Sequence, residues 1–400
     1  MKAIILILYG LCITVMLQAQ EVSKTADVTA GNLKTVLSEE ELSSVTNLTI
    51  TGTIDARDFK TMRDDMPLLA ELDLMGVTIE AYNGPDGTSL WGNEYYPENA
   101  VPEFAFLDGT WTGKKSLDSV VFPESVIQIS QFAFYNSGLS SLSLPLFITS
   151  IHDYSFAYCI NLNLINIPSS LTSIGSWAFY GCTGYTLISI PESVSYIGEA
   201  AFSMCNGMIT VDENNLSFSS LEGILFDKFK TVLISCPTSK SGNYEIPLSV
   251  ERIGYRSFFA CYNLTSVTIP SNVKTIEINA FFECSKLTSI NANSLFPVDL
   301  TNSLNVFYNV DKTNCILYVP YGAKAAYQAA NQWQDFTNIM EAVEGFNLSA
   351  SAVSVASAQG STSTVDIMAN VDWSVSSDQP WLKVNPASGN GNQTLTFTAY

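Results

Sequence analysis

The stretch IPSSLTSIGSWAFYGC, residues 167–182, recurs along the chain with its main residues at fixed intervals. Each of six prolines has an isoleucine six places later and a phenylalanine eleven places later. Five of the six also have a cysteine fourteen places later, where the first copy has Ser137. A spacing of 22 or 23 residues between neighbouring copies predicts an array of stacked repeats. The prolines are Pro123, Pro145, Pro168, Pro191, Pro247 and Pro270.

Each copy is expected to form one coil of a solenoid. Apolar and polar residues alternate just before the proline, as at Val267 and Ile269, which is typical of a strand with one buried face. The proline ends the strand because it has no amide proton to donate. One coil cannot bury its own apolar face, so neighbouring coils must stack. We expect their isoleucines, phenylalanines and cysteines to share one continuous dry core.

The cysteines are expected to be buried and reduced. Equivalent sulfurs in adjacent coils would point the same way, which is poor geometry for a disulfide. An odd number remains once a leader with Cys12 is removed, so the cysteines cannot all pair with one another. The C-x-x-C spacing of common zinc sites does not occur in the sequence, so no metal site is expected. The seven remaining residues are Cys159, Cys182, Cys205, Cys236, Cys261, Cys284 and Cys315.

The composition and the first residues point to an exported, folded chain. Hydrophobic residues make up 47% of the sequence and charged residues only 14%, which is typical of a packed protein. Residues 1–19 have the pattern of a signal peptide, with Lys2, an apolar run and a small residue, Ala19, for cleavage. We expect a secreted or cell-surface protein, outer-membrane or extracellular, without direct membrane insertion. The net charge of −20 opposes binding to nucleic acid.

Caps are expected at both ends of the repeats. Residues 20–115 are interpreted as an N-terminal cap with degenerate repeats, including helical patterns around 33–42 and 57–66. Residues 293–344 are interpreted as a C-terminal cap. It is predicted to contain a helix over 323–330, with Trp333 and Phe336 covering the open end of the core.

The solenoid itself is assigned to residues 116–292 and contains an insertion. The 56 residues between Pro191 and Pro247 hold two periods and extra residues. Apolar runs at 221–226 and 231–235 flank a turn and predict a β-hairpin that projects from a coil or caps it.

Residues 345–400 differ from the repeats in composition. They are rich in Ser, Thr and Val, alternate by twos, and are punctuated by Gly, Pro and Asn. This pattern predicts a partial β-sandwich with Trp373 and Trp381 in its core.

Several motifs resemble those of known families. The coil pattern, SSLEGILFDK at 219–228 and CILYVPYGAKAAYQ at 315–328 resemble the BspA-like leucine-rich repeats of bacterial surface proteins. WSV at 373–375 and PWLKVNPASG at 380–389 resemble a BACON domain. The expected fold is therefore α+β but mostly β: a capped leucine-rich-repeat solenoid followed by a partial β-sandwich. The first resemblance implies adhesion to host or matrix proteins, and the second implies glycan or mucin binding, or a spacer.

Residues for catalysis are scarce. The single histidine, His152, is expected to be an ordinary surface or turn residue. The acid pairs Glu39-Glu40 and Asp64-Asp65 are adjacent residues on predicted helices, so their carboxylates do not converge on a substrate. The sequence has no phosphate-cradling glycine loop and no nucleophile elbow. We therefore expect no enzymatic activity, no catalytic residue and no cofactor.

Two surfaces are candidates for binding a ligand. In the insertion 82–99, aromatic and acidic residues could hold sugar rings or anchor a protein, or instead cover the first coils. The outward strand positions carry small polar residues that suit a large partner, or are simply solvated. The candidates are Tyr82, Asp86, Trp91, Glu94, Tyr95 and Tyr96 in the insertion, and Ser141, Ser143, Asn166, Ser189, Ser266 and Thr268 on the strands.

The sequence predicts a non-enzymatic adhesin whose partner is a host or extracellular-matrix protein. One alternative is a glycan- or mucin-binding accessory protein for polysaccharide use. Another is the binding region of an enzyme that continues past residue 400.

Overall fold

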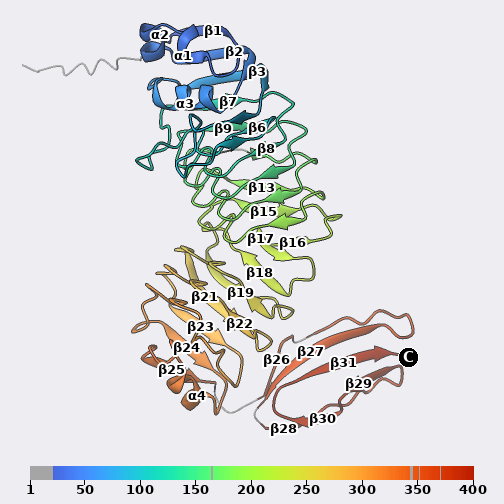
Figure 1. Ribbon diagram of the computed structural model, residues 1–400. Coiled ribbons are helices and arrows are strands. Elements are labelled where there is room, and N and C mark those ends of the chain that lie inside the picture. The colour runs from blue at the N-terminus through green and yellow to red at the C-terminus, as the bar shows by residue number, and fades with distance from the viewer. Residues whose placement is uncertain (1–20, 164, 343–345, 351, 370) are drawn as a thin grey trace, which may run out of the picture.

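The computed structural model describes residues 21–163, 165–342, 346–350, 352–369 and 371–400. The expected signal peptide, residues 1–19, lies outside this part of the chain. The described residues form a stack of coils that runs from the N-terminal helices to the last helix, followed by the sheets of the tail (Figure 1). The predicted fold class, a mostly β capped solenoid followed by a β-sandwich, is confirmed.

The N-terminal end of the stack is a parallel sheet covered by three helices. The helix α3 (Ala56–Asp64) begins with a capping box, because the Asp55 carboxylate accepts the amide proton of Arg57 while the Asp58 carboxylate accepts that of Asp55. The first predicted helical pattern forms two short helices. They are α1 (Leu33–Val36) and α2 (Glu39–Ser44), and the long strands are β1 (Ser23–Val28), β2 (Asn47–Ile54) and β3 (Glu71–Ile79).

Each following coil contributes one strand to each of two parallel sheets. The first sheet continues from β3 through β7 (Ser119–Val121), β9 (Ser141–Ser143) and β11 (Ile165–Asn166). The second consists of the short strands around the isoleucine six places after the proline, so that Ile151 pairs with Ile129 on one side and Ile174 on the other. Its strands are β6 (Ala100–Val101), β8 (Gln128–Ile129), β10 (Ser150–Ile151), β12 (Ser173–Ile174) and β14 (Tyr196–Ile197).

Phenylalanines and cysteines of successive coils form columns in the core. The rings of Phe134 and Phe156 lie 5.3 Å apart between centroids, and the same separation joins Phe156 to Phe179. All seven described cysteines are buried, as predicted. The thiol of Cys182 donates a hydrogen bond to the carbonyl oxygen of Phe156 in the preceding coil, at 3.0 Å. Cysteine therefore suits this position because it is small, largely apolar and still able to donate a proton.

The predicted insertion is part of the stack rather than a projection from it. It is a three-stranded antiparallel meander, in which Leu221 belongs to an additional strand. The last strand of the meander pairs in parallel with the next coil, so the expectation of a projecting or capping hairpin is wrong. The strands are β16 (Phe218–Leu221), β17 (Ile224–Asp227) and β18 (Val232–Ser235), followed by β20 (Arg252–Ile253) and β22 (Thr275–Ile276).

The meander also divides the core. Leu225 packs with the N-terminal coils, whereas Ile224 and Phe226 pack with the C-terminal coils. Alternate side chains of a strand point to opposite faces, so β17 contributes to two buried clusters. The expectation of one continuous core is therefore wrong, and the two clusters meet at this strand.

The C-terminal coils close on the predicted cap. The helix α4 (Lys324–Ala329) precedes Trp333 and Phe336, whose buried rings contact Phe307 at centroid distances of 4.9 and 5.2 Å. This confirms that both residues cover the end of the core. The sheet here consists of β19 (Gly242–Glu245), β21 (Leu264–Ile269), β23 (Ser289–Ala292), β24 (Ile316–Val319) and β25 (Asn338–Glu341).

The tail forms a four-stranded antiparallel sheet and a separate strand pair. Trp373 is buried, as predicted, and its indole nitrogen donates to the carbonyl of Gly391 at 2.8 Å. Trp381 is exposed because it lies in the turn before a strand, so its assignment to the core is wrong. The sheet contains β26 (Phe346–Leu348), β27 (Thr362–Ala369), β31 (Gln393–Ala399) and β29 (Leu382–Asn385), and the pair is β28 (Asp372–Ser374) with β30 (Ser388–Asn390).

Candidate binding surfaces

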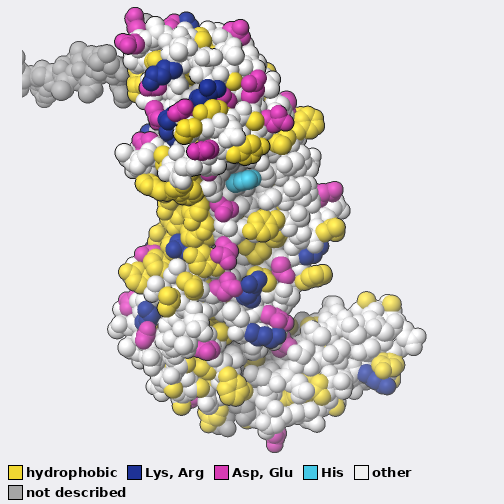
Figure 2. All heavy atoms as spheres, in the orientation of Figure 1, with side chains coloured by type: hydrophobic (Ala, Val, Ile, Leu, Met, Phe, Trp, Pro, Cys, Tyr) yellow, Lys and Arg dark blue, Asp and Glu magenta, His cyan; other side chains and the backbone are white. Residues whose placement is uncertain are grey.

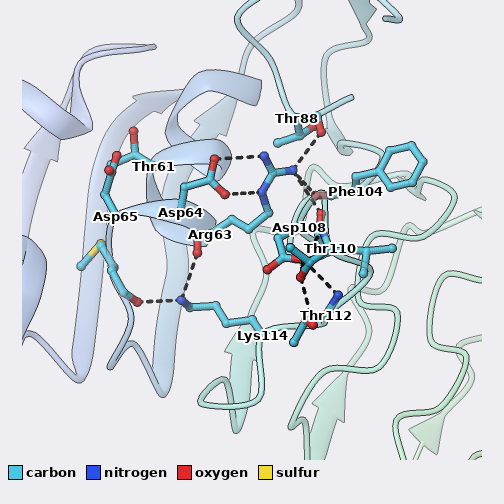
Figure 3. Close-up of polar contacts among 12 residues, drawn as sticks. Thr61, Arg63, Asp64, Asp65, Thr88, Phe104, Asp108, Thr110, Thr112 and Lys114 are labelled. Atoms are coloured by element: carbon cyan, nitrogen blue, oxygen red, sulfur yellow. Dashed lines mark hydrogen bonds and ion pairs between the residues drawn. The ribbon is translucent and has the colours of Figure 1, made fainter. Parts of the chain in front are cut away.

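The insertion 82–99 is anchored to the cap through a buried arginine. Arg63, near the end of α3, donates through its Nη1 atom to the carbonyl oxygens of Thr88 and Phe104, both at 2.9 Å, and it pairs with Asp64 (Figure 3). Nearby, Lys114 donates to the carbonyl oxygen of Met66 at 2.6 Å, and burial lowers the pKa of Lys114 to about 8. Two cations thus tie the helix, the insertion and the first coil together.

Within the insertion, two of the predicted residues stabilise the loop itself. The strands β4 (Tyr82–Asn83) and β5 (Tyr95–Tyr96) pair antiparallel, and the rings of Tyr82 and Tyr96 stack at 5.9 Å. Tyr96 is buried, and its hydroxyl accepts the amide proton of Ser89 at 2.8 Å. Arg57 lies over the ring of Tyr82, 4.6 Å from its centroid.

The other predicted residues of the insertion are exposed but do not converge. The ring of Trp91 is 58% exposed and meets Phe104 edge-on at 4.7 Å. Tyr95 is 60% exposed. Asp86 and Glu94 are also exposed, and the Asp86 carboxylate lies 3.5 Å from the Tyr82 hydroxyl. Tyr95 and Tyr96 line a hollow beside the coils, whereas the other four predicted residues of the insertion are not among the residues that line it.

The predicted strand face falls into three sections. Ser141, Ser143 and Asn166 are exposed on the N-terminal sheet, where they continue rows that begin on β1 and β2. A hollow of about 420 Å³ lies over the first strands of these rows. Ser189 belongs to a separate strand pair, β13 (Leu187–Ile190) with β15 (Met208–Val211). Ser266 and Thr268 are half-buried on the C-terminal sheet, where they accept hydrogen bonds from Ser289 and Asn291.

Sequence reasoning missed a large aromatic cluster whose stacked rings are buried or half-buried and whose outermost rings reach the surface. Four rings at equivalent turn positions stack face to face, with centroid distances of 5.2, 4.8 and 5.7 Å. Further aromatic side chains surround them, and apolar side chains gather on one side of the middle of the molecule in Figure 2. We call this cluster the aromatic face. The four stacked residues are Phe104, Phe132, Tyr154 and Trp177, and the surrounding ones are Trp91, Trp111, Tyr135, Tyr158 and Tyr180.

A sequence signal for the aromatic face did exist. Phe132, Tyr154 and Trp177 each stand nine places after a repeat proline. All three have positive φ angles of 57–58°, a conformation that is uncommon for residues with bulky side chains. This backbone conformation turns each coil sharply and brings the three rings into register.

Two kinds of feature were sought among the described residues: clusters of metal-ligating side chains and helices long enough to span a membrane. Within the ranges given above, no group of three or more His, Cys, Asp and Glu side chains is placed to hold a metal ion. Among the helices that the structure describes, none combines the length and apolar character needed to cross a bilayer.

Comparison with solved structures finds other bacterial repeat proteins. A leucine rich cell surface protein from Faecalibacterium prausnitzii is 20% identical, with 73% of this chain and 83% of that chain covered and a TM-score of 0.45. A leucine-rich repeat protein from Eubacterium ventriosum is 18% identical over 71% of this chain and 68% of that chain, with a TM-score of 0.40. One from Bacteroides ovatus is 21% identical over 63% and 78%, with a TM-score of 0.34.

Family comparison agrees with the repeat pattern. No curated protein shows a significant match to this sequence. The tail, residues 346–400, matches the family model described as the viral BACON domain. Six copies of the repeat model match residues 107–231 and 236–317, which is more than half of the sequence. The chain therefore belongs to the BspA type leucine rich repeat region family.

Proposed function

We propose that this protein is a non-enzymatic adhesin that is exported and binds a host or matrix protein through the aromatic face. The observation that carries the proposal is the exposure of Trp91 and Trp111, at 58% and 49%, at the edge of a stacked aromatic cluster. Tryptophan and tyrosine dominate the energetics of protein interfaces because they bury a large area with few rotatable bonds. Exposed aromatic rings that stand next to one another on a soluble protein often mark an interaction site.

The charge of the protein defines the chemistry of that partner. A net charge of −20 attracts basic surfaces and accelerates their association. The aromatic face already accommodates one guanidinium, since Arg256 lies 4.7 Å from the ring centroid of Trp177 and 4.3 Å from that of Phe259. Such cation–π contacts contribute about 0.5 to 2 kcal/mol each. The proposed partner is therefore a protein that presents arginine or lysine side chains.

The test compares two sets of aromatic residues. The whole protein would be passed over a panel of immobilised matrix proteins ordered by isoelectric point, at low and physiological salt. We expect the basic members to bind, and the double substitution Trp91→Ala and Trp111→Ala to weaken binding at least tenfold. Phe229→Ala is the matched control, because Phe229 is 81% exposed, lies between β17 and β18, and is not one of the residues of the aromatic face. Equal effects of the two variants would contradict the proposal.

A further inference from the structure

A hollow of about 170 Å³ lies beside the aromatic insertion. The insertion contributes Asn93, Tyr95, Tyr96 and Pro97, and residues in or next to the short strands β6, β8 and β10 form the rest. His152, the cyan side chain in Figure 2, lines this hollow and is exposed, as expected for a surface residue. The hollow is thus built by the insertion together with three successive coils.

The lining of the hollow is rich in groups that hydrogen-bond to hydroxyls. Gln128, Gln131 and His152 supply amides and an imidazole, and Glu103 supplies a carboxylate. One Glu103 oxygen accepts a proton from Nε2 of Gln131 at 3.2 Å. The other, Oε1, is buried and has no partner among the protein atoms described. Glu103 therefore keeps hydrogen-bonding capacity that the described protein atoms do not use.

The ring of Tyr95 complements these polar groups. Tyr95 is 60% exposed and lines the hollow. The hydroxyl of its neighbour Tyr96 is already hydrogen-bonded within the loop, to the amide of Ser89 and the carbonyl oxygen of Asn93. An exposed aromatic ring offers an apolar surface with a polar end, which suits the face of a sugar ring. The hollow therefore combines one exposed aromatic ring with several side chains that can hydrogen-bond to hydroxyl groups.

We propose that this hollow binds a neutral saccharide through a single terminal ring. The hollow has a volume of about 170 Å³, which suits one ring, and the rest of a longer saccharide would extend beyond its lining. Neither lysine nor arginine is among its lining residues, so a sialylated or sulfated sugar would meet the Glu103 carboxylate without a compensating cation. This site is distinct from the proposed protein contact at Trp91 and Trp111 and does not depend on it.

The experiment uses an array of neutral oligosaccharides that end in galactose, mannose or N-acetylglucosamine, together with their sialylated and sulfated counterparts. We expect the whole protein to bind at least one neutral series, with the anionic counterparts at least tenfold weaker. Tyr95→Ala and Glu103→Gln are each expected to weaken that binding at least tenfold. Tyr196→Ala is the matched control, because Tyr196 is 55% exposed on β14 and does not line the hollow.

Several results would overturn the proposal: no binding of wild-type protein to any neutral series, preference for anionic sugars, or retention of binding in Tyr95→Ala. The exposed position of Tyr95 makes its substitution compatible with folding, which circular dichroism would verify. The double substitution Trp91→Ala and Trp111→Ala should keep saccharide binding. If that variant loses protein binding and keeps saccharide binding, the two proposed sites act independently and each proposal is tested by its own variant.

Discussion

The guanidinium of Arg256 lies 4.7 Å from the ring centroid of Trp177, although the two residues belong to coils on opposite sides of the divided core. The coil that follows Trp177 has Ala200 nine places after its proline, where three earlier coils have an aromatic residue. Trp177 therefore has no stacked ring from that coil, and the guanidinium of Arg256 lies against it instead. Its Nη1 atom also donates to the Tyr180 hydroxyl at 3.1 Å. Arg256 therefore fastens the C-terminal coils to the aromatic face of the N-terminal ones.

Replacement of Arg256 should weaken the junction between the two halves. Arg256→Ala removes the cation and the packing of its aliphatic stem, so we expect a loss of about 2 kcal/mol in the free energy of unfolding. Urea denaturation followed by tryptophan fluorescence would measure it. Arg252→Ala is the control, since the exposed pair that Arg252 forms with Glu277 should contribute less than about 1 kcal/mol. An equal loss in both variants would argue against a fastening role.

The buried thiols should make stability fall in alkaline solution. Burial raises the pKa of Cys159 from 9.0 to about 11 and that of Cys205 to about 12. As the pH rises, the unfolded chain therefore releases these thiol protons before the folded chain does. The contribution of the buried thiols to the free energy of unfolding is complete below about pH 9 and is lost as the pH rises through their folded-state pKa values. At pH 10, each such thiol should lower the free energy of unfolding by about 1.4 kcal/mol. Urea midpoints at pH 8 and pH 10 would show the fall.

One buried lysine should have the opposite effect on stability, which it should increase as the pH rises. Burial lowers the pKa of Lys114 from 10.5 to about 8, so between these values the unfolded state holds more protons and stability rises with pH. Several thiols outweigh this single group, and the net change from pH 8 to pH 10 should be negative. Cys159→Ala should make the decline shallower. A pH-independent midpoint, or a steeper decline in this variant, would contradict the assignment of the effect to buried thiols.

Serine should replace the repeat cysteines better than alanine does. Ser137 occupies the equivalent buried position in the first copy, which indicates that the site accepts a hydroxyl. Cys182→Ser keeps a donor for the Phe156 carbonyl, whereas Cys182→Ala removes it and leaves a small void. We expect Cys182→Ala to cost about 1 to 2 kcal/mol and Cys182→Ser to cost less. Thermal unfolding of both variants under reducing conditions would rank them, and the reverse order would show that packing alone decides.

The repeat period was sufficient to predict the coils, the column of phenylalanines and the burial of the cysteines. These features depend on the same residues recurring at the same place, so one pattern describes every coil. The division of the core could not be predicted in this way, because it arises from β17, a strand outside the pattern whose alternate side chains face two clusters. The period did not show that Leu221 lies in a separate strand from Ile224.

The candidate surfaces were harder to predict for a related reason. Exposed residues obey no packing rule, so composition alone placed Tyr96 and Trp91 in one group although the structure buries the first and exposes the second. The hollow beside Tyr95 depends on Glu103 and Gln131, which are brought together by the stacking of coils and not by proximity in the sequence. The aromatic face was detectable nine places after three of the six repeat prolines, at a position that varies between copies.

Arg63 should be essential for the order of the insertion, which contributes Trp91 to one proposed site and Tyr95 to the other. Arg63→Ala removes hydrogen bonds to three carbonyl oxygens and leaves them buried, so we expect a loss of about 3 kcal/mol in stability. Hydrogen exchange should become faster in residues 82–99 before it does in the distant coils. Arg63→Lys should recover only part of the protection, because an ammonium lacks the planar fork of donors. Lys34→Ala, which breaks an exposed pair with Asp65, should leave the insertion protected. If exchange in the insertion stays slow in Arg63→Ala, the stacked tyrosines and not the arginine hold the loop.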